Sequence, residues 1–126
     1  MKRLIIILFV AILYACDSKP SLDQGEHHLV HTAYFWFEES VTEAQKEAFK
    51  ASSEELKSIP EVIALYTGKP ADTDRPIVER SYDYAVVVLL KDLAAHDAYQ
   101  QHPIHQKLLA DYSPLWQKVM VTDIER

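Results

Sequence analysis

Beyond residue 27, apolar positions follow two periods along the chain, one typical of strands and one typical of helices. Four stretches rich in β-branched and aromatic residues predict strands: 28–37, 62–68, 82–90 and 116–124. Residues 42–58 carry apolar side chains at helical spacing, and two shorter helical segments follow Asp92 and Pro103. The predicted order is therefore strand, helix, two strands, two helices and a last strand.

Capping residues and prolines mark the predicted helix boundaries. Thr42 and Gln45 have the spacing of a capping box, and Pro60 stops the helix that begins there. Asp92 is suited to cap the second helix. The third helix begins at Pro103, because proline favours the first helical turn and keeps its predecessor out of helical geometry.

This order of elements is that of a ferredoxin-like α+β fold, a four-stranded antiparallel sheet with helices on one face. Residues 69–81 contain prolines and several charges and predict a long exposed loop. Strands 28–37 and 82–90 are mostly apolar on both faces, although helices would cover only one. We expect a second copy of the sheet to cover the other face, which gives a homodimer and a dimeric α/β barrel.

Simple alternation assigns the faces of the first and last strands. In the first strand it separates His31 and Phe35 from Tyr34 and Trp36. In the last strand one face is predicted to carry Trp116, Lys118, Met120 and Thr122, and the other Gln117, Val119, Val121 and Asp123. Trp116 is therefore expected to point the same way as Lys118.

The amino terminus has the layout of a secretory signal. A positively charged start precedes an apolar run over residues 4–13, which is shorter than the ~20 residues that a membrane-spanning helix needs. The only cysteine, Cys16, follows Ala15, and Leu13-Tyr14-Ala15-Cys16 resembles a bacterial lipobox. That resemblance implies cleavage before Cys16 and its lipidation. The alternatives are a plain secretory signal with an incidental cysteine, and an uncleaved anchor.

The chain is thus predicted to have three parts. Residues 1–15 are a lipoprotein signal peptide, residues 16–27 are the lipidated Cys16 with a flexible tether, and residues 28–126 are one folded domain. The lipid would hold the protein on a membrane of the bacterial cell envelope, facing the periplasm or the exterior.

Composition excludes several classes of function. The chain of 126 residues is 48% hydrophobic and has a net charge of -6, without clusters of Lys or Arg. Because phosphate contacts need clustered basic residues, nucleic acid is not an expected partner. With one cysteine there is no intrachain disulfide and no Cys/His zinc pattern. No motif selects a cofactor, and none is expected.

Reactive side chains concentrate in residues 99–105, Tyr-Gln-Gln-His-Pro-Ile-His. Tyr99 is expected to end one helix and His105 to lie in the first turn of the next, while His102 caps that helix. His105 could remove a proton from a carbon beside a carbonyl, with the Tyr99 hydroxyl on the enolate oxygen. Alternatively, the two side chains only bind each other or nearby backbone and hold the helix junction.

Other candidate positions are open to two interpretations. His31 is either a satisfied core histidine or a pocket group, and His96 is expected to face outward. A metal site formed by His31, His102 and His105 is a third possibility, but no carboxylate lies at ligand spacing among them, so no metal is predicted. The aromatic residues, including Tyr84 and Trp116, either fill the core or line a cavity.

Residues 28–126 resemble the stress-responsive A/B barrel (Dabb) family of dimeric α+β barrels. The resemblance lies in four segments: the first strand with His31 and Phe35-Trp36-Phe37, the capping segment 41–46, the strand 82–88, and residues 99–105. It implies a pocket between the sheet and the helices of each subunit.

Within that family the chain is similar to a plant polyketide cyclase, olivetolic acid cyclase. This similarity implies that His105 matches a general base, Tyr99 a substrate-positioning tyrosine and His31 a pocket histidine. Tyr84 stands where the cyclase has another pocket histidine, so the particular reaction does not follow from the resemblance.

Two functions remain open. The first is a lipid-anchored Dabb-domain protein that binds a small apolar ligand or acts in stress response, with a pocket that includes His31, Tyr84 and Trp116. The second is a cyclase or lyase in which His105 is the general base and Tyr99 positions a carbonyl. The envelope location favours the first, because polyketide substrates usually arise inside the cell.

Overall fold

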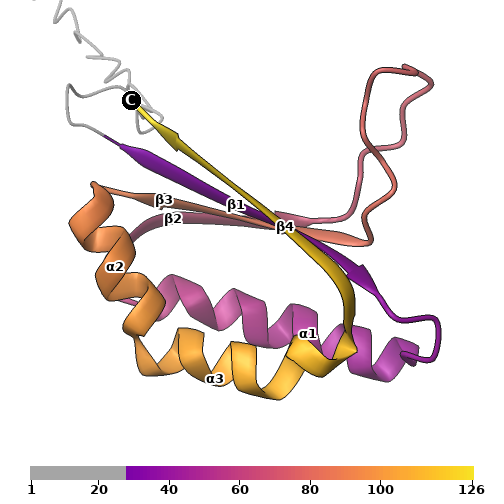
Figure 1. The fold of residues 1–126 in the computed structure, drawn as a ribbon, viewed down its shortest axis with the longest axis horizontal. Coiled ribbons are helices and arrows are strands. Elements are labelled where there is room, and N and C mark those ends of the chain that lie inside the picture. The colour runs from indigo at the N-terminus through magenta and orange to yellow at the C-terminus, as the bar shows by residue number, and fades with distance from the viewer. Residues whose placement is uncertain (1–27) are drawn as a thin grey trace, which may run out of the picture.

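The computed structural model describes residues 28–126, which form an α+β ferredoxin-like fold (Figure 1). The predicted signal peptide and the tether with Cys16 lie outside the described residues. The strands are β1 (Leu29–Phe37), β2 (Val62–Gly68), β3 (Tyr84–Leu90) and β4 (Trp116–Glu125). The helices are α1 (Glu43–Glu54), α2 (Leu93–Gln101) and α3 (Pro103–Tyr112), with single 3₁₀ turns at η1 (Glu55–Ser58) and η2 (Ser113–Leu115).

The four strands form one antiparallel sheet in the order β2-β3-β1-β4. Figure 1 shows all three helices on one side of this sheet, with α1 and α3 side by side, while the long loop between β2 and β3 extends away on the other side. The predicted fold class is therefore confirmed. Among residues 28–126, helices cover one face of the sheet and none covers the other, which we call the bare face.

Local signals position the helices as expected. The backbone N–H of Thr42 donates to Gln45 Oε1 at 2.9 Å, and Thr42 Oγ1 accepts from the backbone N–H of Gln45 at 3.3 Å. The Asp92 carboxylate accepts from the backbone N–H of Ala95 at 2.8 Å. A side-chain cap replaces a backbone partner that the first turn lacks, and one cap contributes about 1 kcal/mol.

The core lies between the helices and the helix-facing side of the sheet. Its centre is Phe49 of α1, which is fully buried and touches five aromatic rings. These rings belong to Phe35, Phe37, Tyr84, Tyr112 and Trp116, at centroid distances of 4.9 to 5.9 Å. We call this group the aromatic cluster. Edge-to-face contacts of this kind add to the stabilisation from apolar burial.

The predicted faces of the last strand are wrong at Trp116. A bulge between Trp36 and Phe37 shifts the register, so that Lys118 pairs with Trp36 but Trp116 pairs with Phe37. A bulge adds one residue to one strand and inverts the alternation beyond it. Trp116 therefore packs on the helix side against Phe35, whereas Lys118 Nζ lies 4.2 Å from the Trp36 ring centroid on the bare face.

The third strand begins two residues later than predicted. Asp83 stands just before it and donates its backbone N–H to Phe35 O at 2.9 Å. Its carboxylate accepts from the backbone N–H of Phe37 at 2.8 Å. Tyr82 packs against Tyr34, with ring centroids 5.1 Å apart.

Within residues 28–126, no helix is both long and apolar enough to cross a membrane.

Candidate functional site

The junction between α2 and α3 brings the reactive segment into the core. Tyr99 lies in the last turn of α2, His102 has extended backbone geometry, and Pro103 is the first residue of α3. His102 Nδ1 accepts a hydrogen bond from the backbone N–H of Ile104 at 3.3 Å. The predicted capping role of His102 is confirmed, and Tyr99 and His105 are placed on either side of the turn.

The structure brings three of the predicted site residues together. Tyr99 lies between two imidazoles, with ring centroids 4.7 Å from His105 and 5.8 Å from His31. All three side chains are buried, from β1, α2 and α3. We call His31, Tyr99 and His105 the histidine cluster. His31 is far from Tyr99 and His105 in the sequence, so the convergence depends on the docking of α2 and α3 on the sheet.

His105 has a defined tautomer. Its Nδ1 lies 3.0 Å from the carbonyl oxygen of Gln100, and because a carbonyl only accepts, Nδ1 carries the proton. Burial lowers the pKa of His105, the Gln100 bond opposes this, and the nearby His31 and His96 lower it further. The ring is therefore neutral at pH 7, and Nε2 holds a lone pair. This is the state that a general base requires.

His31 is held by its neighbour across the sheet. It pairs with Asp123 in the β1–β4 register, and its Nδ1 lies 2.7 Å from Asp123 Oδ1. Burial lowers the pKa of His31, while the hydrogen bond and charge of Asp123 partly offset that effect. The bond to the carboxylate orients the ring and puts the proton of the neutral form on Nδ1.

The expectation that His96 faces outward is wrong. Its ring centroid lies 4.9 Å from that of His31, and its Nε2 is 3.3 Å from His31 Nδ1. The amide nitrogen of Gln100 lies 3.1 Å from the same His96 nitrogen. His96 precedes Tyr99 by three residues, and residues at that spacing share a helix face. That spacing was the sequence signal for His96, since Tyr99 was already expected to point inward.

Tyr99 keeps its proton under all physiological conditions. The side chain is 2% exposed, and burial raises its pKa well above the ordinary value for a phenol. A hydroxyl that stays protonated next to a neutral imidazole can donate a hydrogen bond to a carbonyl or an oxyanion. The cluster thus combines the Nε2 lone pairs of His31 and His105, which accept a proton, with one hydroxyl that donates a hydrogen bond.

The remaining predicted pocket residues, Tyr84 and Trp116, belong to the aromatic cluster and pack against Phe49. Trp116 Nε1 is buried and has no hydrogen-bond partner among the residues that the structure describes. An unpaired buried donor costs about 1–3 kcal/mol, which a ligand or a water molecule could recover. The five predicted residues therefore fall into two groups on the same face of the sheet.

The predicted alternative metal trio of His31, His102 and His105 is not brought together in residues 28–126. A different set is, formed by His31, His96 and Asp123, whose ligand atoms all lie within 4.8 Å of one another. No carboxylate lies at ligand spacing from these histidines in the sequence. Asp123 belongs to the last strand and reaches His31 only through the pairing of β4 with β1.

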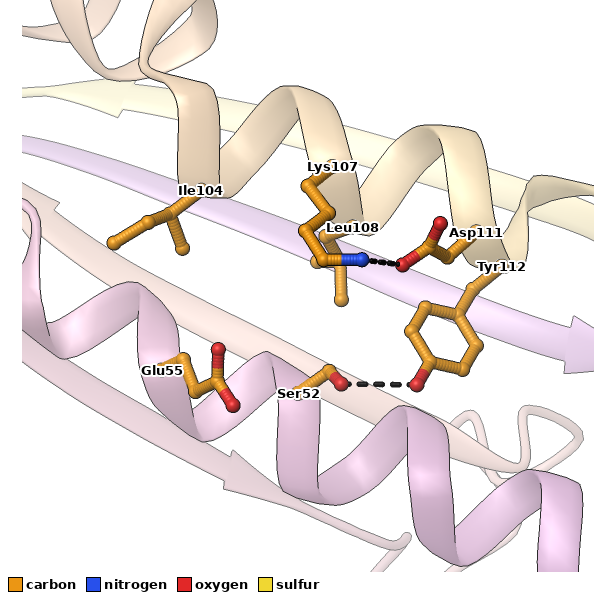
Figure 2. A pocket seen from close by; sticks show the side chains of 7 residues that line it. All are labelled: Ser52, Glu55, Ile104, Lys107, Leu108, Asp111 and Tyr112. Atoms are coloured by element: carbon orange, nitrogen blue, oxygen red, sulfur yellow. Dashed lines mark hydrogen bonds and ion pairs between the residues drawn. The ribbon is translucent and has the colours of Figure 1, made fainter.

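A separate shallow hollow lies between α1 and α3 (Figure 2). Its accessible volume is about 50 Å³, and Ser52 and Tyr112 hydrogen-bond across one end at 2.9 Å. Lys107 and Asp111 form an ion pair on its rim. Ligand pockets usually have several hundred Å³. This hollow contains no predicted site residue and is too small for most organic ligands.

Comparison with known proteins points to one family. The family model described as Stress responsive A/B Barrel Domain matches residues 29–126, which is all but one of the residues that the structure describes. A search of curated proteins found no match.

Several solved structures share the fold. A dimeric ferredoxin-like protein from Thermobifida fusca is 27% identical, with 84% of this chain and 97% of that chain covered and a TM-score of 0.69. A Dabb family protein from Mesorhizobium loti is 20% identical, with 79% and 96% covered and a TM-score of 0.64. The hydroxynitrile lyase from Passiflora edulis is 16% identical, with 79% and 93% covered and a TM-score of 0.68.

Proposed function

Because the chain belongs to the stress-responsive A/B barrel domain family, we propose that it binds a small molecule at the histidine cluster. The observation that supports this most is the state of His105, which is neutral, oriented by Gln100 through Nδ1, and has its ring centroid 4.7 Å from that of Tyr99. An unprotonated Nε2 is a hydrogen-bond acceptor, so it favours a ligand with a proton to donate.

The chemistry of the cluster suggests the class of ligand. His105 Nε2 accepts a hydrogen bond or a proton, and the Tyr99 hydroxyl donates to an oxygen. Tyr99 belongs to the hydrophobic core, while His96, Gln100 and Asp123 add polar groups around the two imidazoles. A small apolar molecule that carries a hydroxyl or an acidic C–H beside a carbonyl fits both groups. The unpaired Nε1 of Trp116 offers one further donor toward the aromatic cluster.

A second candidate function is turnover of that ligand by proton transfer. The tautomer of His105 favours it, and the neighbour named as a hydroxynitrile lyase supports lyase chemistry on this fold. In such a step, His105 Nε2 takes a proton from the ligand and the electron pair moves toward a carbonyl oxygen, which Tyr99 stabilises through its hydroxyl. A positioned base of this kind contributes ~10²–10⁴-fold.

Identification of a ligand that stays bound during purification tests whether His105 binds a ligand or has only a structural role. Small molecules extracted from the purified chain are identified by mass spectrometry, with His105→Ala as the test and His102→Asn as the matched control. Asn can still cap α3, so the control should keep its fold and its ligand. Loss of the ligand in His105→Ala alone supports the proposal, and equal retention in all three chains contradicts it.

Turnover by proton transfer is tested by hydrogen–deuterium exchange. The chain is incubated with a methyl ketone in D₂O, and the exchange of the C–H protons beside the carbonyl is followed by NMR. Exchange above the buffer rate that disappears in His105→Ala supports the second candidate. Exchange at the buffer rate in the wild-type chain limits the cluster to binding.

We also propose a homodimer in which the bare faces of two sheets meet. Tyr66, Met120 and Ile124 are substantially exposed on this face, Tyr66 at 55% and Ile124 at 58%. Apolar patches of this kind favour a partner, and related structures from other organisms are described as dimeric. Light scattering in detergent should give a dimer that becomes a monomer with Met120→Asp. A monomeric wild-type chain would exclude this arrangement.

The lipid anchor is a further part of the proposal, supported by the Leu-Tyr-Ala-Cys sequence before the tether. Lipidation of Cys16 would hold the domain on a bacterial envelope membrane. Mass spectrometry of the chain from a bacterial host should show an acylated amino-terminal Cys16, and Cys16→Ser should move the protein to the soluble fraction. An unmodified Cys16 in the membrane-derived protein contradicts lipidation.

A further inference from the structure

We propose that His31, His96 and Asp123 bind a divalent transition-metal ion, with zinc as the best fit. The three donor atoms are His31 Nδ1, His96 Nε2 and Asp123 Oδ1, and all lie within 4.8 Å of one another. They come from β1, α2 and β4, so the site exists only in the folded chain. Two imidazoles and one carboxylate are a recurrent ligand set for zinc and for non-haem iron.

The spacing of the donors fits a tetrahedral ion. Bonds of 2.0–2.1 Å to zinc place two ligand atoms about 3.3 Å apart along a tetrahedron edge. The two imidazole nitrogens of His31 and His96 are 3.3 Å apart. The Asp123 oxygen is 2.7 Å from His31 Nδ1, a hydrogen-bond distance that opens when a metal replaces the shared proton. The Asp123 oxygen, which lies within 4.8 Å of the His96 nitrogen, must also move toward His96, and its exposed side chain leaves room for that movement.

Charge and protonation are compatible with a cation. Asp123 contributes one negative charge and the two imidazoles bind as neutral ligands. When the metal takes His31 Nδ1, the ring proton moves to Nε2, so the neutral imidazole changes tautomer and needs no co-reactant. Nitrogen donors favour zinc, nickel, copper or iron over magnesium and calcium, which prefer oxygen.

The surroundings provide both access and support. The Asp123 side chain is 43% exposed, which opens a path from solvent, whereas His31 is buried. The Gln100 amide lies 3.1 Å from His96 Nε2, where it can turn to a metal-bound water. Three protein ligands leave a coordination position open for water or a ligand, as in zinc sites that do chemistry.

The test is isothermal titration of the full-length chain in detergent with Zn²⁺, and with Mg²⁺ as a comparison. We expect one Zn²⁺ per chain and no binding of Mg²⁺ at the same concentration. His96→Ala and Asp123→Asn should each weaken Zn²⁺ binding about 100-fold or more, since removal of an outer-sphere partner alone costs 10–100-fold. Circular dichroism of both variants verifies the fold, and Asp123→Asn serves if His96→Ala does not fold.

Two further variants distinguish metal binding from the proposed function of His105 and from binding by other histidines. His105→Ala removes the proposed proton acceptor and should leave Zn²⁺ binding unchanged, and His102→Asn should do the same. Absence of one-to-one Zn²⁺ binding in the wild-type chain overturns the proposal. So does Zn²⁺ binding that survives both His96→Ala and Asp123→Asn, because the metal would then lie elsewhere.

Discussion

Two regions on the helix-facing side of the sheet differ in the chemistry of their buried side chains. The aromatic cluster around Phe49 and the histidine cluster around Tyr99 both rest on β1, on Phe35 and His31 respectively. These two positions are four residues apart, about 13 Å along a strand. In the first region, rings contact rings on every side of Phe49. In the second, two imidazoles and a phenol are buried, and hydrogen bonds to Asp123 and Gln100 orient the imidazoles.

The aromatic cluster stabilises the fold, whereas the histidine cluster holds the reactive side chains. Burial of an aromatic ring is favourable wherever it fits. Burial of an imidazole is costly, since it disfavours the charged form and requires a partner for each ring nitrogen. His31 and His105 bear that cost, seen in their lowered pKa values. Because burial of oriented polar groups lowers stability, the histidine cluster is a better candidate for a functional site than the aromatic cluster.

Removal of Phe49 should have the largest effect on stability. Phe49→Ala deletes a fully buried ring with five aromatic neighbours, and such substitutions cost about 3–5 kcal/mol. Ile77→Ala is the control, because Ile77 is 92% exposed and surface changes stay within ~0.5 kcal/mol. Urea unfolding of both variants measures the difference. A loss below 1 kcal/mol for Phe49→Ala would mean that this cluster does not centre the core.

A smaller effect is expected at the junction that carries the histidine cluster. His102→Ala removes the side-chain acceptor for the Ile104 N–H, and loss of a helix cap costs about 1 kcal/mol. His102→Asn restores an acceptor and should recover most of that stability. The same unfolding assay compares the two variants. If alanine and asparagine are equally stable, the hydrogen bond of His102 does not stabilise α3.

The two regions should also respond differently to pH. His31 and His105 have pKa values below the ordinary 6.5, so the unfolded chain binds more protons than the folded chain as pH falls. Their contribution to stability is complete above pH 6.5 and is lost as pH falls from there toward the lower pKa values of the folded state. Unfolding free energies between pH 7.5 and 5.5 should decline in the wild-type chain.

The matched variant for this pH series is His105→Gln, which removes one of the two titrating groups. Its unfolding free energy should decline less steeply over the same pH interval. The decline in Phe49→Leu should match that of the wild-type chain, because no titrating group is changed. Parallel slopes in wild type and His105→Gln would show that His105 keeps its ordinary pKa.

Much of the fold could be predicted from local signals, because capping and proline effects act within one turn. Thr42 with Gln45, Asp92, and Pro103 place the helices where the structure has them. The face of Trp116 could not be predicted, since the bulge beside Trp36 arises from pairing between strands about 80 residues apart. Alternation along one strand contains no information about such a shift.

The site was only partly visible for the same reason. Tyr99, His102 and His105 lie in one short segment, and their roles at the junction follow from Pro103. Asp123 becomes the partner of His31 only through the β1–β4 register, 92 residues apart. His96 was predictable in principle from its helical spacing to Tyr99, but its contact with His31 requires the docked helix.

His105 is a neutral imidazole that carries its proton on Nδ1 and a lone pair on Nε2, and its ring lies beside that of Tyr99. NMR of the chain with ¹⁵N-labelled histidine reads both ring nitrogens directly. At pH 7 the account predicts a protonated Nδ1 and an unprotonated Nε2 for His105, identified by the signals that disappear in His105→Gln. A ring that is charged at pH 7, or one that carries its proton on Nε2, would contradict it.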